Sequence, residues 1–180
     1  MRTGQLLVTA ALLLALAGCA PTGTQGSTPP SASATPVFAS DAEALAAAEK
    51  AYAAYVRTSD QILIDGGSNP ERLQALTSAR VYDEELKGFE LTAKNGWRST
   101  GGTTYDHFTL QAYNPDDHDA LVVAYVCSDV SRVDVLDSNG TSVVSAGRPD
   151  RTPFQITFAL RGSATLVLAR DDVWTGGGVC

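Results

Sequence analysis

Basic residues, histidines and long apolar runs are scarce in this sequence, and each shortage excludes a class of function. The 180 residues contain 13 Lys and Arg against 20 Asp and Glu, a formal net charge of −7. So acidic a balance disfavours a surface that binds nucleic-acid phosphates, and nucleic acid is not an expected partner. The apolar run at residues 6–16 is shorter than the roughly 20 residues that span a bilayer core.

Sequence patterns typical of metal sites and hydrolases are also missing. The two histidines, His107 and His118, do not stand in an H-E-x-x-H spacing or beside a C-x-x-C pair. The acidic residues 116–119 lack the glycine and the distal glutamate of an EF-hand loop, and a polar turn explains them better. Ser138 and Ser163 do not stand in a G-x-S-x-G elbow. We therefore expect no metal site and no cofactor, and we assign no catalytic residue.

The N-terminus has the pattern of a secretion signal. Arg2 supplies a basic start, the apolar run follows, and Leu16-Ala17-Gly18-Cys19 closes the segment. These last four residues resemble the lipobox of bacterial lipoproteins. The resemblance implies removal of residues 1–18, diacylglycerol on the Cys19 sulfur, and anchoring to the outside of the bacterial cell membrane. The alternatives are an ordinary secretory signal and a short transmembrane helix, for which the apolar run is too short.

Residues 19–37 are expected to be a tether between the lipid and the folded part. They are rich in Ser, Thr, Pro and Gly, so they have little apolar surface to bury in a core. The remaining residues, 38–180, are enough for a single globular domain.

A long amphipathic helix is predicted over residues 41–64. Ser40 and Glu43 have the spacing of a capping box, in which each side chain accepts from the backbone amide of the other residue. Apolar residues then recur at steps of three and four, and Gly66 and Gly67 provide the stop. The apolar stripe of this helix requires a partner surface.

Two further helices and a set of strands are predicted after it. A short helix begins at Asn69-Pro70-Glu71, and a longer one covers about 78–95 before Asn95-Gly96. Beyond Trp97 the hydrophobic period changes from helical to two. The predicted strands are 105–113, 121–129, 133–135 paired with 142–144 around Asn139-Gly140, 154–161, and 164–173. Helices followed by an antiparallel meander predict an α+β domain.

Residues 40–180 resemble the nuclear transport factor 2-like superfamily and, within it, small secreted lipoproteins of actinobacteria. The resemblance is carried by the capped first helix, the Gly96-Trp97 entry into the strands, residues 125–129, the 137–140 hairpin, and Trp174 with Cys180. It implies a cystatin-like roll, in which the N-terminal helices pack in the concavity of a curved antiparallel sheet.

Two cysteines remain once Cys19 carries lipid. Outside the cell disulfides persist, so Cys127 and Cys180 are expected to form a bridge that holds the glycine-rich C-terminal tail against a central strand.

A cavity between the first helix and the sheet is the expected binding site. Its candidate residues are Tyr52, Tyr55, Asp106 and His107. As strand neighbours, Asp106 and His107 are expected to point to opposite faces. The function favoured is non-catalytic: an envelope module that binds a small apolar ligand or another envelope protein. The alternative, carried by the family resemblance alone, is an isomerase- or dehydratase-like enzyme that uses the cavity.

Overall fold

The structure is a computed structural model that describes residues 36–163 and 165–180. These residues belong to one compact unit, Thr35–Cys180. The expected leader, the lipidated Cys19 and nearly all of the tether lie outside the described residues. Among the described residues, no helix combines the length and the apolar composition needed to cross a membrane.

Helix α1 spans Asp41–Ile64, the predicted bounds. The Glu43 amide donates to Ser40 Oγ at 3.2 Å, as the capping box requires. The Glu43 carboxylate accepts from the Ala39 amide at 2.8 Å, one residue before the predicted partner. Gly66 and Gly67 then adopt φ values of 71° and 80°, the left-handed region in which glycine ends helices at little cost.

Of the other two predicted helices, the longer one agrees with the prediction and the shorter one is reduced to a single turn. Helix α2 spans Ala79–Asn95, with Ser78 as its N-cap and Gly96 as its left-handed C-cap. The short helix is only a 3-10 turn, η1, at Pro70–Leu73. Asn69 is at the N-cap position and Pro70 begins the turn, as predicted, but Asn69 has φ 54° and its side chain makes no capping hydrogen bond.

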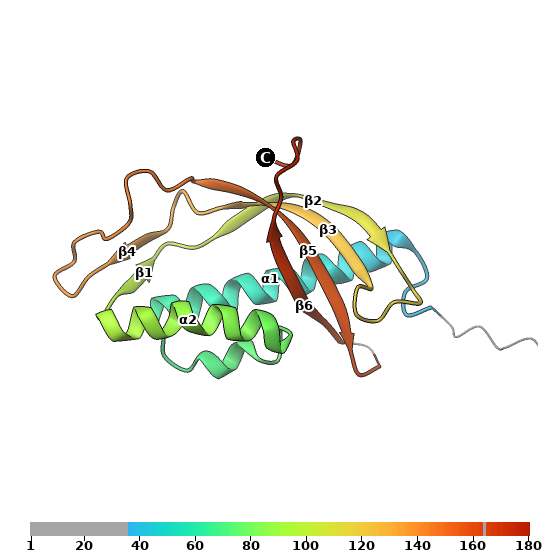
Figure 1. Ribbon diagram of the computed structural model, residues 1–180, viewed down its shortest axis with the longest axis horizontal. Coiled ribbons are helices and arrows are strands. Elements are labelled where there is room, and N and C mark those ends of the chain that lie inside the picture. Colours follow the sequence, from blue (N-terminus) through green and yellow to red (C-terminus); the bar gives the residue numbers. More distant parts are fainter. Residues whose placement is uncertain (1–35, 164) are drawn as a thin grey trace, which may run out of the picture. The chain divides into compact units, whose positions relative to one another are not determined.

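The main sheet is an antiparallel meander with strand order β2-β3-β5-β6. Its strands are β2 (Thr104–Tyr113), β3 (Val122–Asp129), β5 (Arg151–Arg161) and β6 (Thr165–Val173). The sheet curves over α1, while α2 lies beside α1 (Figure 1). The predicted α+β class, with helices against the inner side of a curved antiparallel sheet, is confirmed.

A second, two-stranded sheet pairs β1 (Arg98–Thr100) with β4 (Asp134–Leu136). The sequence did not predict β1. The predicted 142–144 strand makes only one bridge to β4, Leu136 to Ser142. The principal partner of β4 therefore comes from a distant part of the chain.

The apolar stripe of α1 packs on the inner face of the main sheet. The largest fully buried side chains include Ile62, Phe89, Leu121, Ile156, Phe158 and Leu168. Burying a side chain of this size contributes about 1.5–3 kcal/mol, so this contact is the main stabilising layer.

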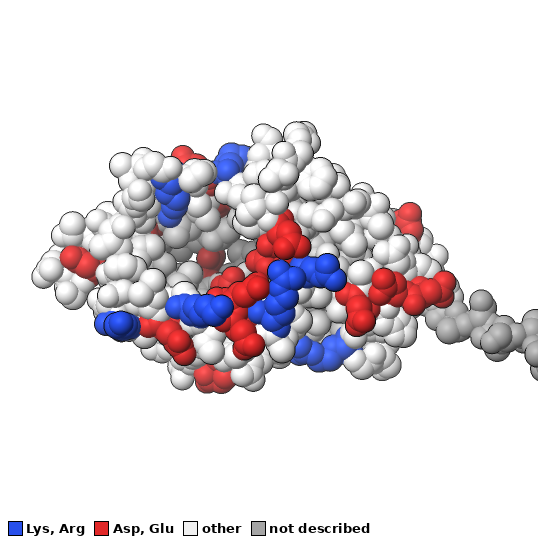
Figure 2. Space-filling view, in the orientation of Figure 1, with Lys and Arg blue, Asp and Glu red and all other residues white. Residues whose placement is uncertain are grey.

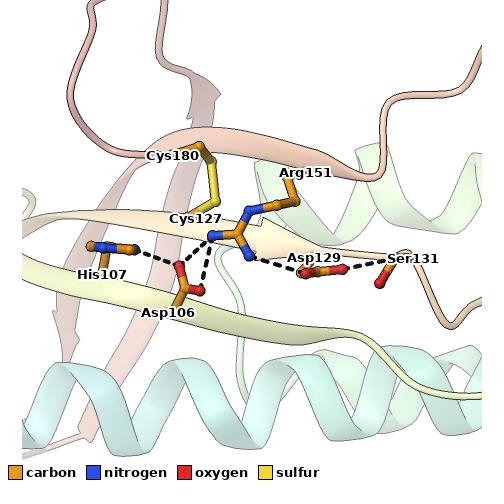
Figure 3. The surroundings of a disulfide bond; sticks show 7 residues. All are labelled: Asp106, His107, Cys127, Asp129, Ser131, Arg151 and Cys180. Atoms are coloured by element: carbon orange, nitrogen blue, oxygen red, sulfur yellow. Dashed lines mark hydrogen bonds and ion pairs between the residues drawn. A yellow bond between two sulfur atoms is a disulfide. The ribbon is translucent and has the colours of Figure 1, made fainter.

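The outer face of the sheet carries the C-terminal tail. Cys127 and Cys180 are joined by a disulfide with an S–S distance of 2.07 Å, the expected pairing (Figure 3). The Trp174 ring packs against Tyr125 with centroids 4.8 Å apart, and Val179 is buried. The tail therefore covers part of the face opposite α1.

Candidate functional site

A pocket of about 200 Å³ lies between α1, α2 and the sheet. We call it the acidic pocket. Its polar lining comprises the carboxyls of Asp60, Glu85 and Asp171 and the hydroxyls of Tyr52, Tyr55, Ser59, Thr103 and Ser128. Its apolar lining is Val56, Val130 and Phe154. Figure 2 shows the face that is hollowed between the helices and the strands above them.

The two tyrosines of the pocket come from α1, as expected. Tyr52 and Tyr55 are three residues apart, so both lie on the helix stripe that faces the sheet. Tyr52 packs among aromatic rings, at 5.0 Å from Tyr105 and 5.7 Å from Phe108 between centroids. Burial raises the pKa of both phenols, so they remain protonated hydrogen-bond donors.

Glu85 enters the pocket from α2. Its carboxylate accepts from the Tyr55 hydroxyl at 2.8 Å and from Ser59 Oγ at 3.3 Å, which links the two helices. Burial raises the pKa of the Glu85 carboxyl, although these two donors oppose the shift. The Glu85 carboxyl is therefore partly removed from water, and its two hydrogen-bond donors are uncharged.

Asp171 enters from β6 because of a β-bulge. Leu168 pairs with Phe158, but Arg170 pairs with Thr157, so Ala169 is an extra residue in β6. The bulge reverses the alternation of side chains, and Asp171 points inward beside Glu85 instead of outward. Burial, and next the nearby Glu85 charge, raise the pKa of Asp171 to about 6.

Asp60 of α1 also lines the pocket. Its carboxylate accepts from the Thr103 amide and from Thr103 Oγ1, both at 2.8 Å. These bonds tie α1 to the chain segment that enters β2. No Lys, Arg or His lines the acidic pocket among the described residues.

Asp106 and His107 do not belong to the pocket, which corrects the sequence-based expectation. Both are exposed on the outer face of the sheet, beside the disulfide (Figure 3). Asp106 accepts from Arg151 Nη2 at 2.7 Å, and His107 Nδ1 lies 2.6 Å from Asp106 Oδ1.

The two neighbours share one face because His107 sits in a bulge. Its φ is 51°, and the register of β2 against β3 shifts between Asp106 and Thr109. The extra residue cancels the alternation that would have separated the two side chains. The exposed Arg151 guanidinium also reaches Asp129 at 3.1 Å, and the Asp106 pKa is lowered chiefly by Arg151.

Of the pocket's lining, only Tyr52 and Tyr55 were predicted from the sequence, and the two most consequential residues that were not predicted are Glu85 and Asp171. The sequence held a signal for Glu85, which lies four residues after Val81 and four before Phe89, both buried on α2. A carboxyl at a position of the apolar stripe is a candidate site residue. No comparable signal marks Asp171, because simple alternation from Leu166 and Leu168 points Arg170 inward.

Within the described part of the chain, no group of three or more His, Cys, Asp or Glu side chains is arranged to hold a metal ion. The acidic pocket can instead hold a small organic molecule, with hydroxyls and carboxyls to orient it and one apolar wall.

Comparisons with known proteins do not identify a family. No family model and no curated protein matches this chain. One solved structure that matches is the solution NMR structure of a de novo designed β-sheet protein, which is 16% identical over 72% of this chain and 88% of that chain. Its TM-score is 0.32.

Proposed function

We propose that this chain is a bacterial lipoprotein whose folded domain binds a small ligand outside the cell membrane, without catalysing a reaction. The observation that carries the binding role is the acidic pocket, where the chain leaves about 200 Å³ between helices and sheet unfilled. Small-molecule sites in proteins are concave and combine apolar walls with a few polar groups that orient the ligand. The acidic pocket has this composition, with half-buried carboxyls and hydroxyls beside an apolar wall, and therefore favours a ligand.

The lipidated Cys19 would hold this domain near the membrane. The support is the Leu16-Ala17-Gly18-Cys19 sequence and the Ser, Thr and Pro-rich segment that follows it. We also propose, from the sequence resemblance, that the folded domain belongs to the nuclear transport factor 2-like superfamily. Cys19→Ser should release the protein from the membrane fraction, and metabolic labelling with a fatty acid should disappear. Continued membrane retention of the variant would contradict the anchor.

Native mass spectrometry of the full-length chain, purified in mild detergent from its own membrane, tests the binding role. We expect a small molecule to be retained. Ser128→Phe, which fills the acidic pocket from β3, should abolish retention, whereas Ser131→Phe, at an exposed position, should preserve it. Retention that is equal in both variants would contradict binding in this pocket.

Catalysis is the second candidate, because one observation favours it. Asp171, with its pKa raised to about 6, shares the pocket with the protonated hydroxyls of Tyr52 and Tyr55. Such a carboxylate can remove a proton from carbon while a phenol stabilises the oxyanion that develops. Recovery of the retained molecule unchanged, by wild type and Asp171→Asn alike, would rule out this candidate.

A further inference from the structure

The charges of the acidic pocket are one-sided. Asp60, Glu85 and Asp171 line it without a basic residue among the described residues. The Asp60 carboxylate accepts from Thr103, and the Glu85 carboxylate accepts only from the neutral hydroxyls of Tyr55 and Ser59. Glu85 and Asp171 are both partly desolvated, and after desolvation the Glu85 charge raises the pKa of Asp171 most. A positive charge between them would offset the cost of ionising both carboxyls.

The Tyr52 hydroxyl is a second, independent feature of the pocket. Tyr52 is only 5% exposed, and its hydroxyl lies in the pocket beside the hydroxyl of Ser128, with which it interacts. A phenol oxygen can accept as well as donate a hydrogen bond, so the Tyr52 hydroxyl has capacity for a ligand group in addition to Ser128.

We propose that the acidic pocket binds a small organic ammonium ion, a primary amine that carries an apolar body. This inference rests on the proposed binding role and names the ligand class. A primary ammonium has three N–H donors, which the Asp171 and Glu85 carboxylates and the Tyr52 phenol oxygen can accept. The apolar body would contact Val56, Val130 and Phe154.

The surroundings of Asp171 set the pH dependence of binding. Glu85, Glu84 and Arg80 approach it from α2, Asp172 is its neighbour on β6, and Tyr52 and Tyr55 face it from α1. Arg80 does not supply the missing charge in the pocket, because its guanidinium contacts the exposed Glu84 at 3.1 Å and Asp172 at 3.5 Å. Ammonium binding should therefore weaken as the pH falls through about 6, where Asp171 takes up a proton.

Three probes of one shape test the charge requirement: benzylamine, benzyl alcohol and benzoate. Dissociation constants are measured by NMR titration of the full-length chain at neutral pH. We expect benzylamine to bind about tenfold more tightly than benzyl alcohol, because hydrogen bonds to a charged group are stronger, and benzoate to bind least. The backbone amides of Ser128 and Thr103 should shift during the benzylamine titration.

Matched variants assign the effect to the pocket. Asp171→Asn should weaken benzylamine binding by about tenfold and leave benzyl alcohol unchanged, whereas Asp172→Asn should alter neither by more than about twofold. Tyr52→Phe is a second variant, and it should weaken benzylamine binding while keeping the native spectrum.

The outcomes separate this inference from the proposed function. Equal binding of benzyl alcohol and benzylamine in the pocket would overturn the ammonium inference and support small-ligand binding. Binding of Ca²⁺ alone at the same residues, without benzylamine, would also overturn it. Binding of none of the three probes would overturn it too, and the retention experiment with Ser128→Phe decides the binding role on its own.

Discussion

The Tyr55 hydroxyl donates a hydrogen bond of 2.8 Å to Glu85 Oε1 and so joins α1 to α2 across one side of the acidic pocket. Tyr55→Phe should lower the free energy of unfolding by about 1–3 kcal/mol, because a buried carboxylate then loses a donor. Chemical denaturation measures the loss. Tyr82→Phe, at a half-buried position of α2, is the matched control and should change stability much less. Equal losses in the two variants would contradict the role of the bond.

Asp171→Asn should stabilise the domain above about pH 6 and have little effect below about pH 4. The pKa of Asp171 is raised to about 6 in the folded state, so folding binds a proton between its ordinary pKa and that value. Wild-type stability therefore falls as the pH rises through this window, and asparagine removes that part of the slope. A rise of about 2–4 °C in Tm near neutral pH is expected. An unchanged slope would show that Asp171 ionises normally.

Removal of the Cys127–Cys180 disulfide should cost up to about 4 kcal/mol of unfolding free energy, because the bridge joins residues 53 apart and restricts the unfolded chain. The Cys127→Ala/Cys180→Ala variant should also become sensitive to proteases within the tail that begins at Trp174. Cys19→Ser keeps the bridge and serves as the control. Wild-type denaturant resistance in the double variant would contradict this prediction.

Gly67→Ala should destabilise the domain more than Gly96→Ala. Both glycines have positive φ values, 80° and 65°, so both substitutions introduce backbone strain of about 1–2 kcal/mol. A Cβ atom on Gly67 would also overlap the Phe89 carbonyl oxygen of α2, whereas one on Gly96 would meet open space. Denaturation midpoints of the two variants compare the costs, and a larger loss at Gly96 would contradict the close approach of Gly67 to α2.

Asp106→Asn and His107→Gln should leave benzylamine binding within about twofold of wild type, because a contact outside the pocket adds little to affinity. Both residues are on the outer face of the sheet, where Asp106 pairs with Arg151. A tenfold loss of benzylamine binding in either variant would contradict this prediction and indicate that these residues contribute to the binding site.

Local signals in the sequence were enough to predict the helices and the class of fold. Ser40 and Gly66 bound α1 because capping and left-handed termination depend on neighbouring residues alone. The change to a period of two after Trp97 predicted the meander for the same reason. The shortness of η1 and the existence of strand β1 were not predicted, because a single turn and a three-residue strand carry little periodic signal.

The sequence by itself determined the capped α1, the order of helices before strands, and a cysteine pair that the fold joins. Only the tertiary structure decided which side chains meet in the acidic pocket. A bulge of one residue changes the alternation of the side chains that follow it, and the bulges at His107 and Ala169 placed His107 outside, beside Asp106, and Asp171 inside. Such bulges depend on the pairing of strands far apart in the chain, which hydrophobic alternation along a single strand does not record.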